Sequence, residues 1–121
     1  MKSRFIAFLV ATALLLPSTL SAQGSIDGFW SFVMNGPFGA VTAEVDLFAD
    51  GTVLIGQFEL SDGQVWPIEN GTVNGNSINF DLPRGDSGVV YRMSATIQGD
   101  QATGTATAMG TTAEWTMTRS Q

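Results

Sequence analysis

Residues 41–47 (VTAEVDL) decide the fold of this chain. Apolar and polar side chains alternate at every step, so the apolar ones share one face of an extended strand and the polar ones share the other. A strand of this kind is typical of an antiparallel sheet that covers a core on one side and meets water on the other. The stretch therefore predicts an all-β fold.

The same alternation returns in two later stretches. In residues 77–82 the pattern places Ile78, Phe80 and Leu82 inward, with polar residues between them. Residues 88–97 also alternate, and their predicted inner face is Val89, Tyr91, Met93, Ala95 and Ile97. Residues 101–109 place Ala102, Gly104, Ala106 and Ala108 on one face, which leaves room for large side chains opposite.

Turn residues separate these stretches at nearly even intervals. Asp50-Gly51 and Asn74-Gly75 are examples, and such pairs favour the positive φ angles of tight hairpins. Evenly spaced hairpins favour strands that run up and down and close into a barrel, which removes exposed edges. We predict an eight-stranded antiparallel up-and-down β-barrel, with an open sandwich as the alternative. The predicted strands are residues 28–35, 40–48, 52–60, 64–70, 77–82, 88–97, 101–109 and 112–119.

The first 22 residues have the pattern of a secretory signal peptide. Lys2 and Arg4 give a basic start, residues 5–16 (FIAFLVATALLL) form an apolar run, and Ser21-Ala22 supplies small residues for cleavage. The run is shorter than the roughly 20 residues of a membrane-spanning helix, so we expect no stable membrane anchor. The predictions are a cleaved signal over residues 1–22, one domain over residues 23–121, and a secreted or periplasmic protein.

Charge and cysteine content limit the partners of that domain. Residues 23–121 contain three arginines, no lysine and 11 acidic residues, which gives a formal charge of −8. Such a surface repels phosphate backbones and anionic lipid headgroups, so we expect no nucleic-acid partner. The chain has no cysteine, so burial and backbone hydrogen bonds must hold the domain together.

Both ends of the domain resemble a known family. Gly28-Phe29-Trp30 opens the first predicted strand, and Trp115-Thr116-Met117-Thr118-Arg119 closes the last. A Gly-x-Trp followed by a late arginine resembles the lipocalin and avidin-like (calycin) barrels. The resemblance implies that Trp30 closes one end of the barrel and that Arg119 lies across its ring, where a guanidinium can stack on the indole.

The middle of the chain is similar to a short β-barrel module of secreted bacterial proteins. The similar phrases are residues 71–80, 99–105 and 115–119. They consist mainly of turn glycines and core positions, so they imply a fold and not an activity. The chain departs from lipocalins in lacking their disulfides and terminal helix, and from avidins in lacking the polar residues that hold biotin.

Composition excludes much of the usual catalytic chemistry. The chain has no histidine and no cysteine, which rules out Ser-His-Asp triads, Cys-His pairs and zinc sites built on those residues. No phosphate loop with a following lysine and no EF-hand order of oxygen ligands occurs. We expect no catalytic residues, no metal and no cofactor. Whether the protein is an enzyme stays open, and a non-catalytic function is favoured.

Alternation places Glu44, Glu59 and Glu114 outside, where water solvates them. A register shifted by one residue would instead bring Glu59 and Glu114 into the interior, together with Gln57 and Arg92. That polar interior would suit binding or acid–base chemistry.

Aromatic residues are the candidate ligand contacts. They either fill the core of the small domain or line an apolar pocket. Trp66 precedes Pro67, which cannot donate to a strand ladder, so it is predicted at an edge, bend or rim. The candidate ligand-binding residues are Trp30, Phe58, Trp66, Tyr91, Trp115 and Arg119.

Three functions fit these observations. The leading hypothesis is an exported, non-catalytic barrel that binds a small apolar or amphipathic molecule in its interior or mouth. The alternative is a protein-interaction module, such as a periplasmic protease inhibitor, with a filled barrel and an exposed apolar patch. An isomerase or cyclase that uses only carboxylate, tyrosine and arginine is the third hypothesis. The oligomeric state is left open.

Overall fold

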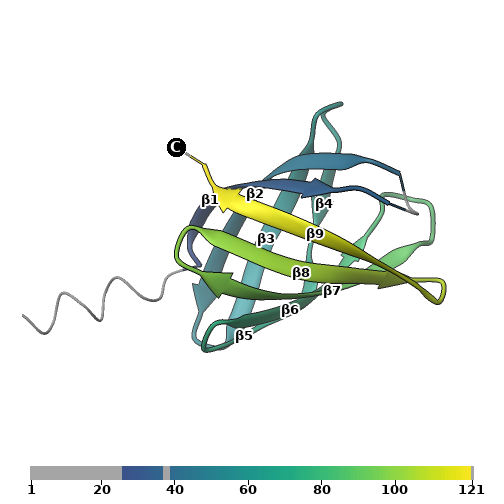
Figure 1. Cartoon of the computed structure of the whole chain (residues 1–121). Coiled ribbons are helices and arrows are strands. Elements are labelled where there is room, and N and C mark those ends of the chain that lie inside the picture. The colour runs from purple at the N-terminus through teal and green to yellow at the C-terminus, as the bar shows by residue number, and fades with distance from the viewer. Residues whose placement is uncertain (1–25, 37–38, 121) are drawn as a thin grey trace, which may run out of the picture.

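One continuous antiparallel sheet closes on itself to form a barrel in a computed structural model, which describes residues 26–36 and 39–120 (Figure 1). The predicted signal peptide over residues 1–22 lies outside these described residues. Within them, no helix is long and apolar enough to cross a membrane. The strands are β1 (Gly28–Met34), β2 (Val41–Asp50), β3 (Val53–Leu60), β4 (Val65–Pro67), β5 (Glu69–Asn74), β6 (Ser77–Pro83), β7 (Val90–Gln98), β8 (Gln101–Ala108) and β9 (Thr111–Arg119).

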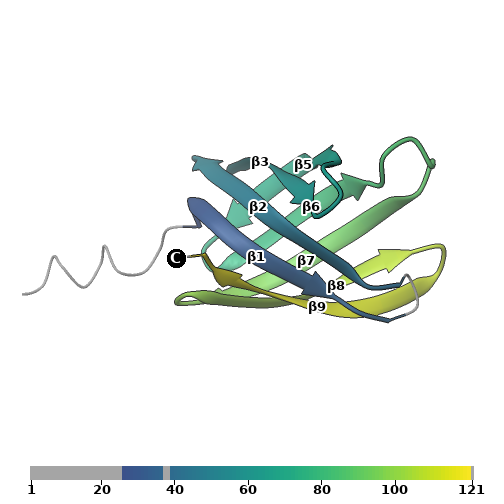
Figure 2. The same cartoon turned by 90° about the horizontal axis from the view of Figure 1, so that it is seen from above.

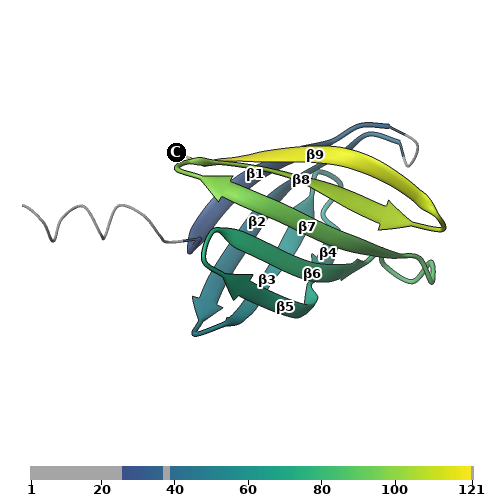
Figure 3. The ribbon, with the colours of Figure 1, turned by 60° about the horizontal axis from the view of Figure 1, so that its bottom comes forward.

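The strands occupy eight positions around the barrel. The sheet runs β2-β1-β9-β8-β7-β6-β5-β3, and pairing of β2 with β3 closes the ring. Figure 2 shows β1 between β2 and β9, and Figure 3 shows β7, β6 and β5 following one another along the wall. β4 and β5 share one position, because β3 pairs with β4 along one part of its length and with β5 along another. The predicted eight-stranded antiparallel barrel is confirmed.

The predicted strand over residues 64–70 is wrong in one respect, because it is broken into β4 and β5. Pro67 ends β4, since it has no N–H for the ladder. The β5–β6 register then shifts between Glu69 and Thr72, where Asn70 has a φ of 54°. This irregularity is a bulge, which bends β5 and interrupts its pairing with β6.

The predicted inner and outer faces are confirmed. Val41, Val45 and Leu47 of β2 are buried, as are Ile78, Phe80 and Leu82 of β6 and the central residues of the β7 inner face. The alternative register is wrong, because Gln57, Glu59, Arg92 and Glu114 are exposed. A slip of one residue would expose every large apolar side chain of a strand, so burial fixes the register.

Aromatic rings fill the middle of the barrel. The Phe32 and Phe58 ring centroids lie 4.9 Å apart, and those of Phe32 and Trp115 lie 5.1 Å apart. Phe80 contacts both Phe58 and Trp115, with centroid separations of 5.9 and 6.5 Å. The buried set contains no charged side chain among the described residues. The barrel interior at this level is an apolar core.

Trp30 and Arg119 close one end of the barrel. The guanidinium carbon of Arg119 lies 4.3 Å from the centroid of the Trp30 ring, and Trp30 Nε1 donates to the carbonyl of Ile26 at 2.9 Å. Gly28 has a φ of 124°, and a Cβ there would lie 3.3 Å from Arg119 Nη1. Glycine at position 28 therefore allows Arg119 to reach across the tryptophan, as the sequence resemblance implied.

Candidate functional site

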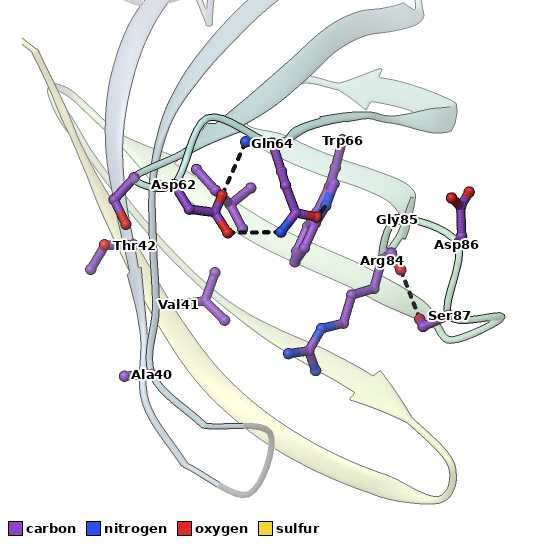
Figure 4. A pocket seen from close by; sticks show the side chains of 12 residues that line it. Ala40, Val41, Thr42, Asp62, Gln64, Trp66, Arg84, Gly85, Asp86 and Ser87 are labelled. Atoms are coloured by element: carbon purple, nitrogen blue, oxygen red, sulfur yellow. Dashed lines mark hydrogen bonds between the residues drawn. The ribbon is translucent and has the colours of Figure 1, made fainter.

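A pocket of about 430 Å³ opens at the end of the barrel opposite to Trp30 (Figure 4). Strand pairing defines this end: β1 and β2 meet there at Met34 and Val41, and β6 and β7 meet there at Pro83 and Val90. Three segments line it, within residues 40–42, 60–66 and 84–87. We call it the mouth pocket.

Apolar side chains form the floor of the mouth pocket. Trp66 is 4% exposed and Val41 is 6% exposed, and Leu60 is partly buried beside them. Trp66 keeps its indole N–H satisfied, because Nε1 donates to Gln64 Oε1 at 3.3 Å. Trp66 lies in the short strand β4, directly before the break at Pro67, which agrees with the predicted edge, bend or rim position.

Arg84 supplies the positive charge of this pocket. Its Nη1 donates to the hydroxyl oxygen of Tyr91 at 3.1 Å, and its guanidinium carbon lies 6.0 Å from the centroid of the Trp66 ring. That separation is at the outer limit of a cation–π contact. Figure 4 shows the Arg84 side chain extending from the β6–β7 loop toward Val41. Arginine, tyrosine and tryptophan thus meet at one rim of the barrel.

The β6–β7 loop that carries Arg84 is held by its own hydrogen bonds. The Arg84 backbone N–H donates to the carbonyl of Val89 at 2.8 Å, and Ser87 Oγ donates to the carbonyl of Arg84 at 2.7 Å. The Val89 backbone N–H donates to Ser87 Oγ at 3.2 Å. These bonds fix the base of the Arg84 side chain, so a ligand would not have to order the loop.

Asp62 and Gln64 line the pocket from the segment between β3 and β4. Asp62 Oδ1 accepts a bond from the backbone N–H of Gln64 at 3.0 Å, and Oδ2 accepts one from Gln64 Nε2 at 2.7 Å. These bonds lower the pKa of the Asp62 carboxyl group below its ordinary value, the backbone bond contributing most. The carboxylate is therefore ionised at neutral pH.

The six candidate residues from the sequence lie at three levels of the barrel. Trp30 and Arg119 lie at the closed end, and Phe58 and Trp115 lie in the aromatic core. Trp66 and Tyr91 lie at the mouth, where both approach Arg84. The structure therefore places two of the six, Trp66 and Tyr91, beside the mouth pocket, and it joins Trp30 and Arg119 at the other end.

Arg84, Gln64 and Asp62 are pocket residues that the sequence reasoning did not select. Alternation contained a signal for Arg84, because Ile78, Phe80 and Leu82 point inward and Arg84 continues this series past Pro83. Gln64 lies two residues before Trp66, so alternation places these two side chains on the same face. The signal was hidden by the turn residues around Arg84, which favour a plain hairpin tip.

Two apolar features lie away from the mouth. On the outer wall, Phe29, Phe48, Val53 and Ile55 are each more than half exposed, and Phe48 pairs directly with Ile55 across β2 and β3. In the core, Trp115 Nε1 is buried and has no hydrogen-bond partner within the described residues. No group of acidic residues in the described ranges has the arrangement of a metal site.

Comparison with known proteins identifies the fold. No protein-family model and no curated protein matches the chain. A solved redesigned β-barrel is similar, with a TM-score of 0.60, 14% identity, and coverage of 78% of this chain and 91% of the other. A de novo designed fluorescence-activating β-barrel has a TM-score of 0.57 and 16% identity, over 83% of this chain and 97% of its own. At these identities the likeness shows a closed antiparallel β-barrel and nothing more specific.

Proposed function

We propose that this protein is an exported, non-catalytic β-barrel that binds a small apolar or amphipathic molecule in its mouth pocket. The observation that carries the proposal is the mouth pocket itself, which combines the apolar floor of Trp66 and Val41 with the polar groups of Arg84 and Gln64. The accessible lining of the pocket is mainly polar, so its polar groups would set the orientation of a ligand, while the floor offers a small apolar contact.

Support for a mouth site, and not an interior one, comes from the aromatic core. Phe32, Phe58, Phe80 and Trp115 contact one another across the barrel, so the middle of the barrel is occupied by side chains. The export part of the proposal rests on residues 1–22. We also propose that the protein is related to the calycin barrels, on the basis of Gly28, Trp30 and Arg119.

Native mass spectrometry of the mature protein, purified gently from its own compartment, tests this function. We expect the mass of residues 23–121 plus one small molecule, which is lost on unfolding. A Ser61→Tyr variant should lose the molecule, because Ser61 lines the mouth pocket and is exposed. An Asn76→Tyr variant, in the β5–β6 turn at the closed end, should keep it. A bare polypeptide mass, and no binding of small amphiphiles to that polypeptide, would exclude the proposal.

The outer wall favours a second candidate function, a protein-interaction module. Phe29, Phe48, Val53 and Ile55 form an exposed apolar patch on neighbouring strands, and clustered exposed aromatics often mark contacts with other proteins. Cross-linking in the native compartment tests it. This candidate would be supported by a partner that cross-links to the wild-type chain and not to Phe48→Ser, when both chains have the same free energy of unfolding. Capture that is equal in both chains would contradict it.

A further inference from the structure

We propose that Arg84 makes the mouth pocket selective for molecules that carry a single carboxylate at one end of an apolar body. This inference rests on the proposed function of the mouth pocket and names the class of ligand that the pocket takes.

The three arginines of the described residues differ in their partners. Arg92 forms an ion pair with Asp81, with Nε and Oδ1 3.6 Å apart, and Arg119 forms one with Asp100, with Nε and Oδ1 3.0 Å apart. Arg84 forms no ion pair within the described residues, and its guanidinium makes one hydrogen bond, to the neutral hydroxyl of Tyr91. The domain has 11 acidic residues and three arginines. Among the described residues, Arg84 is the arginine that has no acidic partner.

Carboxylates do lie near Arg84, but they are directed elsewhere. Asp62 is engaged by both the backbone and the side chain of Gln64. Figure 4 shows the Asp86 carboxylate turned away from the Arg84 guanidinium, although the two residues are nearly adjacent in the loop. The positive charge is thus left for a group that enters the pocket.

The geometry of Arg84 suits a carboxylate. A guanidinium has five N–H donors in a planar fork, and a pair of them can bind both oxygens of one carboxylate. One donor is committed to Tyr91, which restrains the position of the group. Arg84 and Trp66 both line the pocket, and the guanidinium carbon lies 6.0 Å from the centroid of the Trp66 ring, so an anion on the remaining donors would have this ring nearby.

Asp62 limits the charge of the ligand. It is an ionised carboxylate that lines the same pocket, so it would repel a doubly charged group such as a phosphate monoester more strongly than a monoanion. Acidic residues on the remote walls matter less, because charges more than about 10 Å apart are largely screened at 0.1 M salt.

The floor defines the rest of the ligand. Trp66 and Val41 are nearly buried and Leu60 is partly buried, so the floor offers a small apolar contact next to Arg84 for a molecule whose carboxylate binds there. An amphiphile of this kind gains both a charge-assisted hydrogen bond and apolar burial.

Three probes with the same alkyl chain test the inference: octanoate, 1-octanol and octylammonium. Binding is measured by calorimetry, and the indole N–H resonance of Trp66 reports whether the mouth pocket is the site. We expect octanoate to bind most tightly, although the acidic domain as a whole attracts the cation. Loss of a charge-assisted bond in Arg84→Gln should weaken octanoate binding by about tenfold. Octanol binding should stay unchanged in this variant.

Two further variants control for charge and geometry. Arg84→Lys keeps the charge but loses the planar fork, so its affinity for octanoate should lie between those of wild type and Arg84→Gln. Arg92→Gln removes an exposed arginine from the outer wall and should bind all three probes as wild type does.

The outcomes separate this inference from the proposed function. If octanol binds in the mouth as tightly as octanoate, or if Arg84→Gln leaves octanoate binding unchanged, the carboxylate inference is wrong and the mouth pocket remains a binding site for neutral molecules. If no probe shifts the Trp66 resonance at millimolar concentration, both the inference and the proposed function fail.

Discussion

Arg119 covers the ring of Trp30 and at the same time joins two segments of the chain. Its guanidinium carbon is 4.3 Å from the ring centroid, its Nη1 donates to the carbonyl of Asp27 at 2.9 Å, and its Nε donates to Asp100 Oδ1 at 3.0 Å. The closed end is therefore held by one cation that contacts the start of the domain and the β7–β8 turn. At the mouth, the guanidinium carbon of Arg84 lies 6.0 Å from the centroid of the Trp66 ring, and Arg84 has no such ion pair within residues 26–36 and 39–120. One end of the barrel is thus tied shut and the other is left accessible.

Replacement of Arg119 by alanine should destabilise the barrel. The variant loses the stacking on Trp30 and the bond to Asp27, so we expect the free energy of unfolding to fall by about 1–3 kcal/mol. Urea unfolding followed by tryptophan fluorescence measures this. Arg92→Ala is the control, because its side chain is 78% exposed and its loss should change stability by less than about 0.5 kcal/mol. Equal effects of the two variants would show that Arg119 has no special role.

The two buried tryptophans should respond differently to replacement by phenylalanine. Trp30→Phe leaves the Ile26 carbonyl without its 2.9 Å bond and removes the ring beneath Arg119. Trp115→Phe removes an N–H that has no partner within the described residues. We expect Trp30→Phe to lower the free energy of unfolding by about 1–3 kcal/mol more than Trp115→Phe does. A larger cost for Trp115→Phe would mean that its N–H is satisfied in solution, for example by a buried water.

Gly104→Ala should destabilise the wall between β7 and β8. A Cβ at this position would overlap the carbonyl oxygen of Ser94 and lie 2.7 Å from the Cβ of Ala95, so the backbone would have to shift. We expect a loss of about 1–3 kcal/mol, as for overpacked cores. Thr105→Ala is the neighbouring control, since that side chain points outward. Thermal unfolding of both variants measures the difference, and an unchanged melting temperature for Gly104→Ala would contradict the close approach.

The pKa of the Asp62 carboxyl group should lie below its ordinary value. Its pKa is lowered in the folded state by the bonds from Gln64, so these bonds add stability above the unfolded-state pKa and lose it as the pH falls through the folded-state pKa. Gln64→Ala removes the side-chain bond and keeps the backbone bond, so the pKa of Asp62 should rise part of the way to its ordinary value. NMR titration of the carboxyl carbon measures it. If the pKa stays the same in Gln64→Ala, the side-chain bond is absent in solution.

Strand faces could be predicted from the sequence because the side-chain period of a strand is two. Once burial fixes that Val45 points inward, the sides of Glu44 and Asp46 follow without knowledge of any partner strand. The same logic assigned Tyr91 and Met93 to the core. The break between Pro67 and Glu69 was harder to predict, because the bulge at Asn70 depends on which strand each half pairs with.

The sequence by itself determined the all-β class and the hairpin order and excluded His- and Cys-based chemistry, and its end motifs predicted the contact of Arg119 with Trp30. Only the tertiary structure decided which polar groups meet at the mouth. Arg84, Gln64 and Tyr91 come from three different segments, and their separation depends on how the barrel closes and how the β6–β7 loop folds back. Local alternation sets the direction of a side chain, but the partner that it meets is set by long-range pairing between strands.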